Sequence, residues 1–328
     1  MIYRSMILLL FGISSMQAQP LAIQKPIQFN TPEADKILSQ LQIFPKDNPW
    51  NEDISQRPIR PDSAAIIASM GARKRFAYNL DMNFILVPPD QKKIPVKILS
   101  YPDESDPGPY PVADETPIEG WPLDKRSLRA AQMGQENADR HMIVVDPVHA
   151  LLYEFYQGRR TDKGWSCACA AIFNLKVNTL RPIGWTSTDA AGLPIFPAIV
   201  RFDDVQRGIV AHAMRFTVDH TKKEFVYPAT HYASRLTDPK LPRMGERFRL
   251  KASFDDSRLS PHARAIARGL KKYGMFVADN GGDWRLSVAP DDRITGLDDL
   301  RKIQGSDFEV IVPTGPQEGP RTPPKKRE

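Results

Sequence analysis

Cysteine is almost absent from this chain of 328 residues. The two cysteines, Cys167 and Cys169, stand in the run WSCACAAIF. Residues i and i+2 of a strand lie about 6.5–7 Å apart, at or beyond the usual limit for a disulfide. Two thiolates make only half of a zinc site, and no Cys or His stands close by in sequence to complete it. We predict two small residues buried in a strand, and no metal bound there.

Long apolar runs are also lacking. The run Met6–Ile13 is far shorter than the roughly 20 residues that a membrane span needs. Arg4 precedes it and the small residues Ser14 and Ala18 follow it, in the order that is typical of a secretory signal peptide. We therefore expect a signal peptide over residues 1–18, no membrane span, and an exported protein, either periplasmic or extracellular.

A basic face is lacking as well, although the formal net charge is +6. Arg4 contributes one positive charge and residues 321–328 contribute three net charges, which leaves +2 for the rest of the chain. Nucleic-acid binding needs clustered basic residues, so we expect no nucleic-acid partner. The proline-rich end of the chain predicts a disordered basic tail over residues 313–328.

The remainder shows no internal repeat, which favours a single β-rich domain over residues 44–312. An N-terminal arm is expected over residues 19–43, with a short helix in PEADKILSQL. A second helix is expected from Ser63 to Met70, with a glycine as its stop signal.

Residues 87–122 form a proline-rich segment, here called the strap. Its nine prolines oppose regular strand pairing and favour an extended path over the surface. Ca²⁺ prefers oxygen ligands, but the acidic residues of the strap lack the EF-hand spacing. We predict no cofactor, leave Ca²⁺ open, and favour a solvated acidic loop. Besides Asp90, the acidic residues of the strap are Asp103, Glu104, Asp106, Asp114, Glu115 and Glu119.

Strand patterns dominate after residue 139. HMIVVD and LLYEFY flank a turn and predict a hairpin, as do MFVAD and WRLSVAP around NGG. Further strands are expected in CACAAIFNL, FPAIVRF, GIVAHAMRFTV, KEFVYPA and RFRLKASF. One helix is expected to begin at Ser260 and Pro261 and to end at Gly274. We expect a mostly β fold with a few helices, a β-sandwich or jelly-roll-like architecture with α+β additions.

Several longer motifs carry a resemblance. The chain resembles a family of exported bacterial proteins, often from soil organisms, over roughly residues 44–310. The resemblance implies export and one continuous domain, and it brings no activity, cofactor or catalytic residue with it. The motifs are DESDPGPYP, DRHMIVVD, RPIGWTSTDAAGLPI, AHAMRFT, MGERFRLKASFD, LKKYGM and ADNG.

Three residues are predicted as acid–base groups, because burying a polar side chain among apolar neighbours is costly without a partner or a role. Glu154 shares a strand face with an aromatic residue, which would raise its pKa, although the opposite face could be the buried one. Asp189 follows GWTST, where capping of backbone N–H groups is the alternative. His212 lies in an expected strand, where a hydrogen-bonded core histidine is the alternative. Asp203 and Asp204 are expected in a solvated turn.

Four further residues are predicted to bind substrate. Trp185 and Tyr232 are candidates for stacking on sugar rings, although aromatic residues in β-rich proteins are usually core. Arg215 would hold an anion or a hydroxyl of the substrate, and His141 is the fourth predicted substrate-binding residue. No HxH or HxxxH spacing supports a metal site among the histidines.

Together these residues suggest an exported enzyme that acts on an extracellular glycan through a carboxylate pair or a His–carboxylate pair. A non-catalytic module that binds a glycan or another surface protein is the alternative. The sequence leaves the oligomeric state open.

Overall fold

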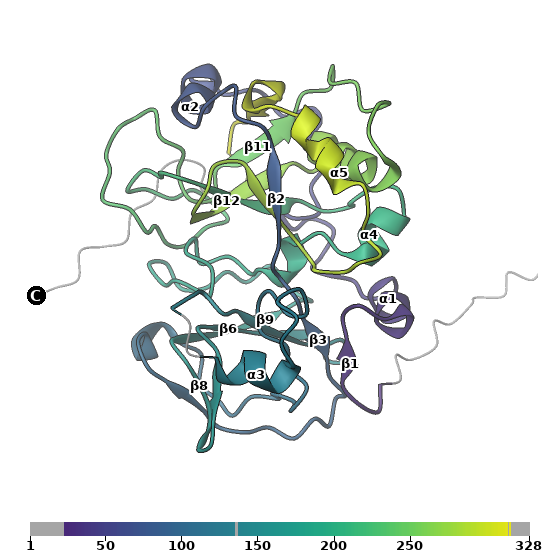
Figure 1. Cartoon of the computed structure of the whole chain (residues 1–328). Helices are drawn as coiled ribbons and strands as arrows, with labels where there is room; N and C mark the ends of the chain where they lie inside the picture. The colour runs from purple at the N-terminus through teal and green to yellow at the C-terminus, as the bar shows by residue number, and fades with distance from the viewer. Residues whose placement is uncertain (1–22, 135–136, 314, 316–328) are drawn as a thin grey trace, which may run out of the picture.

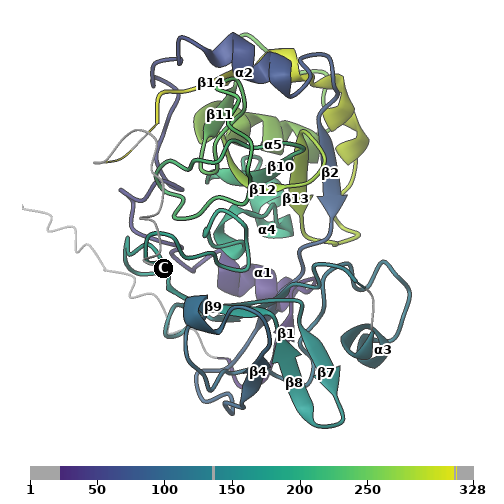
Figure 2. The ribbon, with the colours of Figure 1, turned by 90° about the vertical axis from the view of Figure 1, so that its left-hand side faces the viewer.

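The computed structural model describes residues 23–134, 137–313 and 315. The expected signal peptide over residues 1–18 and residues 316–328 of the expected tail lie outside the described residues. The fold is a mixed α/β arrangement with 23% strand and 18% helix, built on three open mixed sheets (Figures 1 and 2). Strands do outnumber helices, but the part of the chain described here forms no β-sandwich or jelly roll.

A six-stranded sheet occupies the upper half of Figure 1, where α5 and α2 accompany it. Its strand order is β14-β11-β12-β10-β13-β2. β10 pairs parallel with β12 and antiparallel with β13. The strands are β2 (Ala77–Leu80), β10 (Met214–Val218), β11 (Arg247–Leu250), β12 (Met275–Asn280), β13 (Arg285–Val288) and β14 (Phe308–Val310).

The hairpin predicted around NGG is therefore wrong, because β10 lies between β12 and β13. The physical reason is burial on both faces of β10, where Met214, Phe216 and Val218 are fully buried and Arg215 is nearly so. A strand that is covered on both faces belongs in the middle of a sheet, flanked on either side.

A five-stranded sheet and a three-stranded sheet form the lower half of Figure 1. The first predicted hairpin is confirmed, since β5 and β6 pair antiparallel from Met142–Phe155 to Asp146–Leu151. The five-stranded order is β1 (Ile27–Gln28), β3 (Ile85–Leu86), β5 (Met142–Asp146), β6 (Leu151–Tyr156) and β9 (Cys169–Asn174). The three-stranded order is β4 (Val96–Ile98), β8 (Gly164–Cys167) and β7 (Arg159–Thr161).

Three of the five α-helices in the described residues match the sequence expectations: α1 (Pro32–Leu38), α2 (Ser63–Ser69) and α5 (Pro261–Lys272). The strand predicted in FPAIVRF is wrong, since this run forms a 3₁₀ turn and leads into α4. Proline interrupts strand pairing there, and Asp204 accepts a hydrogen bond from the backbone of Arg201 to start the helix. The other helices are α3 (Leu128–Met133), α4 (Phe202–Gln206), η1 (Pro102–Glu104), η2 (Phe196–Ala198), η3 (Leu297–Lys302) and η4 (Gly305–Asp307). None of the helices seen in residues 23–315 is long and apolar enough to cross a membrane.

The segment expected as an N-terminal arm is part of the core. β1 pairs with β3, and Ile27, Phe29 and Leu38 are buried in one continuous hydrophobic cluster that also includes β14. Asp35 of α1 accepts a hydrogen bond of 2.5 Å from Arg293. The N-terminal segment is therefore fixed to residues close to the C-terminal end of the fold.

The strap is solvated only in part: Asp103, Asp114 and Glu115 are exposed, as the favoured interpretation expects, whereas Asp106 and Glu119 are anchored by hydrogen bonds. Asp106 accepts hydrogen bonds from Arg181 Nη1 at 2.5 Å and from the Ile172 backbone at 2.8 Å. Asp114 pairs with Arg160, and Glu119 contacts His141. Within the described ranges, no three His, Cys, Asp or Glu side chains gather as a metal site would require.

Cys167 and Cys169 are free thiols, fully buried at the end of β8 and the start of β9. Burial raises the pKa of both thiols, that of Cys167 to about 12. The expectation of two small buried residues is confirmed, although the two cysteines belong to two different strands and not to one.

Gly274, between α5 and β12, gives a test of the packing. It has φ +68°, and a Cβ atom there would lie 2.3 Å from the Phe248 carbonyl oxygen. We expect Gly274→Ala to lower the free energy of unfolding by about 2–4 kcal/mol, because strain in the left-handed region adds to a backbone clash. Gly208→Ala is the matched control, since φ is +76° and the nearest atom is 4.0 Å away. It should cost only about 1 kcal/mol in urea unfolding. Equal losses would contradict the packing described here.

Candidate functional site

A pocket of about 320 Å³ opens where the strap, the end of β12 and two loops meet. Carboxylates and hydroxyl groups dominate its wall, and it has no Lys or Arg and no aliphatic side chain larger than alanine. The polar lining residues are Tyr101, Glu104, Asp139, Tyr156, Thr186, Ser187, Thr188, Asp189, His231, Asp279 and Asn280. This is the candidate site.

A β-bulge places Asp279 in this wall. The pairing of β10 with β12 shifts between Phe216 and Thr217, so that Ala278 is the extra residue on β12. A bulge reverses the alternation of side chains beyond it and re-aims the residue that follows. The Ala278 carbonyl accepts a hydrogen bond of 3.0 Å from Ala191, which ties the bulge to the loop opposite.

The loop 186–193 presents Asp189 through a tight turn. Asp189 Oδ1 accepts a hydrogen bond of 3.0 Å from the Ala191 backbone. Ser187 Oγ donates to the Leu193 carbonyl at 2.7 Å and accepts from the Asp189 backbone at 2.9 Å. Asp189 and Ser187 therefore bind backbone groups, as the capping alternative predicted. The segment that they stabilise is a turn, however, and not the start of a helix.

Arg215 forms an ion pair with Asp189. Its Nε and one Nη each lie 3.1 Å from Asp189 Oδ2, and its other Nη donates to Ser287 Oγ at 2.6 Å. Both partners of the ion pair are almost completely buried. Arg215 therefore joins the pocket loop to β10 and, through Ser287, to β13.

Ala190 fixes two further groups of the pocket. Its backbone N–H lies 3.4 Å from Asp279 Oδ2, and its carbonyl is 2.8 Å from His231 Nδ1. Because the carbonyl can only accept, His231 Nδ1 carries the proton in this contact, which leaves Nε2 as the remaining acceptor of a neutral ring. One residue of the loop thus orients a carboxylate and an imidazole in the same pocket.

His141 and Glu119 lie behind Thr188. His141 Nδ1 is 2.9 Å from Glu119, and Nε2 is 2.7 Å from the Thr188 carbonyl. Both partners accept, so the ring is doubly protonated. Burial alone would lower the pKa of His141, but the ion pair with Glu119 raises it to about 9. The predicted substrate-binding residue His141 is instead a buried cation that positions Thr188.

Glu154 lies deeper still and does not line the pocket. Its fully buried carboxylate accepts hydrogen bonds from the backbones of Ile195 and Phe196 and from Thr188 Oγ1. Burial raises its pKa, and the hydrogen bonds from Phe196 and Ile195 oppose that rise. Because both carboxylate oxygens are occupied, we interpret Glu154 as a positioning residue.

Carboxylates outnumber cations in this network. Asp81, Glu119, Asp189 and Asp279 face only His141 and Arg215 as charge partners. Burial raises the pKa of Asp189 and Asp81 to about 7 each, and burial also raises the pKa of Asp279. An excess of buried carboxylates retains protons near neutral pH, which is what a general acid requires.

The predicted aromatic residues Trp185 and Tyr232 lie beside the lining rather than in it. Trp185 packs against Arg181, whose guanidinium is 5.5 Å from the ring centre. Tyr232 stacks on His231 with ring centres 5.9 Å apart. Tyr101 lines the pocket and is 43% exposed, so it offers the most accessible aromatic face.

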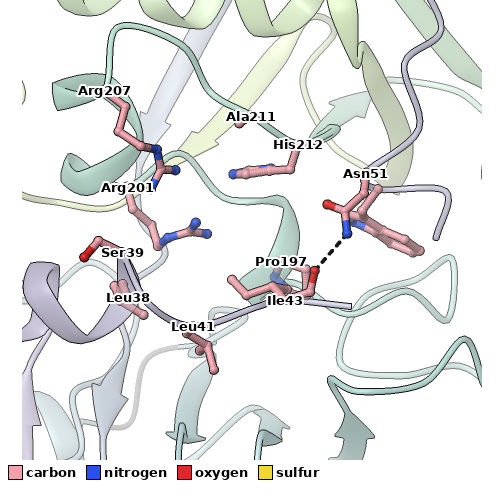
Figure 3. A pocket seen from close by; sticks show the side chains of 11 residues that line it. Leu38, Ser39, Leu41, Ile43, Asn51, Pro197, Arg201, Arg207, Ala211 and His212 are labelled. Atoms are coloured by element: carbon pink, nitrogen blue, oxygen red, sulfur yellow. Dashed lines mark hydrogen bonds between the residues drawn. The ribbon is translucent and has the colours of Figure 1, made fainter. Parts of the chain in front are cut away.

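His212, predicted as the base, lines a different pocket that Figure 3 shows from close by. The strand begins at Met214, so the alternation assumed for His212 does not apply. Asp203 and Asp204, expected in a solvated turn, are buried on α4, and Asp204 contacts His212 Nε2 at 3.2 Å.

Of the residues that the sequence analysis predicted, the structure places Asp189 in the pocket wall, and Arg215, His141 and Glu154 in the network behind it. It missed Asp279 and the role of His231. A signal for Asp279 exists, since ADNG follows the apolar run MFV and a polar group at the end of a buried strand faces the rim of the sheet.

Comparisons with protein-family models, curated proteins and solved structures found no match to this chain.

Glu154→Gln tests the positioning role. An amide NH₂ would face backbone N–H donors, so we expect the free energy of unfolding to fall by about 2–4 kcal/mol. Glu115→Gln is the matched control, because Glu115 is exposed, and it should change stability by less than about 0.5 kcal/mol. Unchanged stability of Glu154→Gln in urea unfolding would contradict the positioning role.

Asp81→Asn tests the excess of carboxylates. Asp81 Oδ1 is buried without a hydrogen-bond partner, and burial raises the pKa to about 7. An acid with a raised folded-state pKa binds more protons when folded, so its contribution to stability is lost as pH rises from about 4 to 7. We expect Asp81→Asn to be close to neutral at pH 4 and to stabilise the protein at pH 8 by up to about 4 kcal/mol. Urea unfolding at both pH values measures this, and a gain that is equal at both would refute it.

Proposed function

We propose that the protein is an exported, glycan-active enzyme whose acid–base chemistry takes place in the 320 Å³ pocket. The observation that carries the proposal is the pairing of Asp279 and His231 around Ala190, whose N–H and carbonyl orient the two side chains. A carboxyl group with a raised pKa and an imidazole in one pocket are the two kinds of group that acid–base cleavage needs.

The lining supports a hydroxyl-rich ligand. Carboxylates, hydroxyls and an amide offer hydrogen-bond partners for sugar hydroxyl groups, and the exposed face of Tyr101 offers a surface for a sugar ring. Four carboxylates without a lining Lys or Arg disfavour a phosphorylated or carboxylated ligand. A neutral glycan unit is the class that fits these groups.

The roles follow from protonation. Asp279 has a raised pKa because of burial, and it would donate a proton to the oxygen that leaves. His231 would use the free Nε2 to remove a proton from the attacking water or from the sugar itself. Asp189 has both oxygens engaged by Ala191 and Arg215, so it positions the loop and adds negative charge beside Asp279.

A non-catalytic glycan-binding module is the second candidate. The observation that favours this module is the ion pair of Asp189 with Arg215. Because Asp189 is held in that pair, Asp279 is, among the described residues, the one lining carboxylate that combines a raised pKa with the absence of a hydrogen bond from a cationic side chain. A pocket with one such acid has no second carboxylate for a catalytic pair. Binding without turnover would then use the same lining residues.

The test is release of reducing ends from a panel of plant, fungal and bacterial glycans, together with retention of the protein on each glycan. We expect one glycan to be cleaved, and Asp279→Asn and His231→Gln each to lower the rate by about 100-fold or more while retention persists. The double variant should be little slower than either single variant, because the two groups act in one step.

Matched controls are Asp292→Asn, at an exposed acid outside the pocket, and His220→Gln, at an exposed histidine whose Nδ1 also contacts a carbonyl. Both should keep the full rate. Retention without product from any glycan would replace the enzyme by the binding module, and neither product nor retention would exclude glycans as the ligand class.

A further inference from the structure

The rim of the candidate pocket carries two carboxylates that the proposed acid–base chemistry does not use. Asp139 is exposed and Glu104 is half-buried, and both line the pocket. A carboxylate in contact with water is ionised at neutral pH, so the rim is negatively charged whether or not Asp279 holds its proton.

No side chain of the chain as described neutralises the rim. The Glu104 carboxylate accepts a hydrogen bond of 2.9 Å from the Thr186 backbone, and Asp139 Oδ1 lies 3.4 Å from the Tyr156 hydroxyl. Both of these partners are neutral. Within residues 23–134, 137–313 and 315, neither carboxylate forms an ion pair, and no Lys or Arg lines the pocket.

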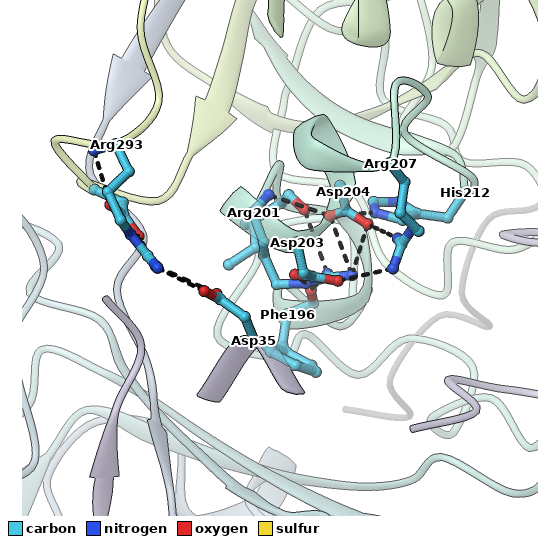
Figure 4. Close-up of polar contacts among 10 residues, drawn as sticks. Asp35, Phe196, Arg201, Asp203, Asp204, Arg207, His212 and Arg293 are labelled. Carbon is cyan, nitrogen blue, oxygen red and sulfur yellow. Dashed lines mark hydrogen bonds and ion pairs between the residues drawn. The ribbon is translucent and has the colours of Figure 1, made fainter. Parts of the chain in front are cut away.

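The ion cluster on α4 shows a different arrangement of the same groups. Asp203 and Asp204 are each paired with both Arg201 and Arg207 (Figure 4). Two cations of fixed charge therefore balance two carboxylates there. At the rim of the pocket, a ligand can supply the positive charge that the chain itself supplies on α4.

The hydroxyl of Tyr156 is the point around which the rim groups lie. Burial raises the pKa of Tyr156 to about 12, and the negative charges of Asp139 and Asp279 add to that rise, as does Tyr101. Such effects weaken with distance, so these side chains surround one phenol. The Tyr156 ring packs on His141, with ring centres 5.6 Å apart, which holds the phenol in place.

The face of Tyr101 favours an organic cation as the ligand. Its side chain is 43% exposed at the rim, and the face of a tyrosine ring attracts cations. An inorganic cation fits less well, because no three His, Cys, Asp or Glu side chains in the described part of the chain gather closely enough to hold one. An ammonium group needs only acceptors for its N–H donors, and a carboxylate and a phenolic oxygen both accept.

We propose, building on the glycan-active function above, that the rim binds an amino sugar whose free amine is protonated, with the ammonium group at Asp139 and the Tyr156 hydroxyl. Glu104 adds negative charge beside it, and the sugar ring lies against Tyr101. This amino sugar is the neighbour, along the glycan, of the neutral unit at Asp279 and His231.

The test is a titration of the full-length protein with glucosamine, N-acetylglucosamine and glucose at pH 7. These sugars differ only at carbon 2, which carries an ammonium, an acetamide or a hydroxyl group. The backbone N–H signals of Thr186, Ala190 and Asn280, which line the pocket, follow binding in ¹H–¹⁵N spectra. We expect glucosamine to bind about tenfold more tightly than either neutral sugar, because charge-assisted hydrogen bonds are roughly twice as strong as neutral ones. High salt should reduce this preference.

Asp139→Asn should reduce the preference for glucosamine over glucose to about threefold or less, because it removes one charge from a rim that water reaches. Adding Glu104→Gln should abolish the preference. Asp162→Asn, at an exposed acid outside the pocket, is the matched control and should keep it. The ratio of the two affinities is the readout, since a variant that only loosens the fold weakens both sugars alike.

Equal binding of the three sugars, tighter binding of N-acetylglucosamine, no saturable binding of glucosamine, or an unchanged preference in folded Asp139→Asn would each overturn the proposal. The outcome is separate from that of the proposed function. A preference for glucosamine without product from any glycan would support the amino-sugar site and overturn the enzyme, whereas cleavage of a neutral glycan without that preference would do the reverse.

Discussion

The buried ion pair between Asp189 and Arg215 is the contact on which the candidate site depends. It joins the loop 186–193 to the central strand β10, and Arg215 extends the connection to Ser287 of β13. Both partners are almost completely buried. Loss of one partner would leave an uncompensated charge in the interior, which costs far more than an exposed pair contributes. The position of Ala190, and through it Asp279 and His231, follows from this pair.

The same region holds an excess of one charge. A network with balanced charges would keep every carboxylate ionised, and none could donate a proton at neutral pH. Here the carboxylates outnumber the cations, and burial shifts the pKa of Asp189 to about 7.

Local patterns predicted the elements whose cause is local. The hairpin of β5 and β6, the proline-started helix α5 and the polar groups Asp189 and Arg215 could all be found from a few neighbouring residues. Asp279 could not, because its direction depends on a bulge that exists only once β12 pairs with β10. His212 was misplaced because the strand begins only at Met214, two residues after His212, although its sequence pattern starts at Gly208. The contacts of His231, Glu154 and the strap join residues far apart in the chain. The spacing of residues along the sequence therefore could not predict these contacts.

The tie between Asp35 and Arg293 has a consequence for how the chain comes together. These residues are 258 positions apart, and β2 likewise pairs in parallel with β13. Asp35 and β2 therefore cannot make these contacts until Arg293 and β13 have been synthesised. Folding that depends on contacts between residues far apart in the chain is slow, and apolar surface stays exposed until those contacts form.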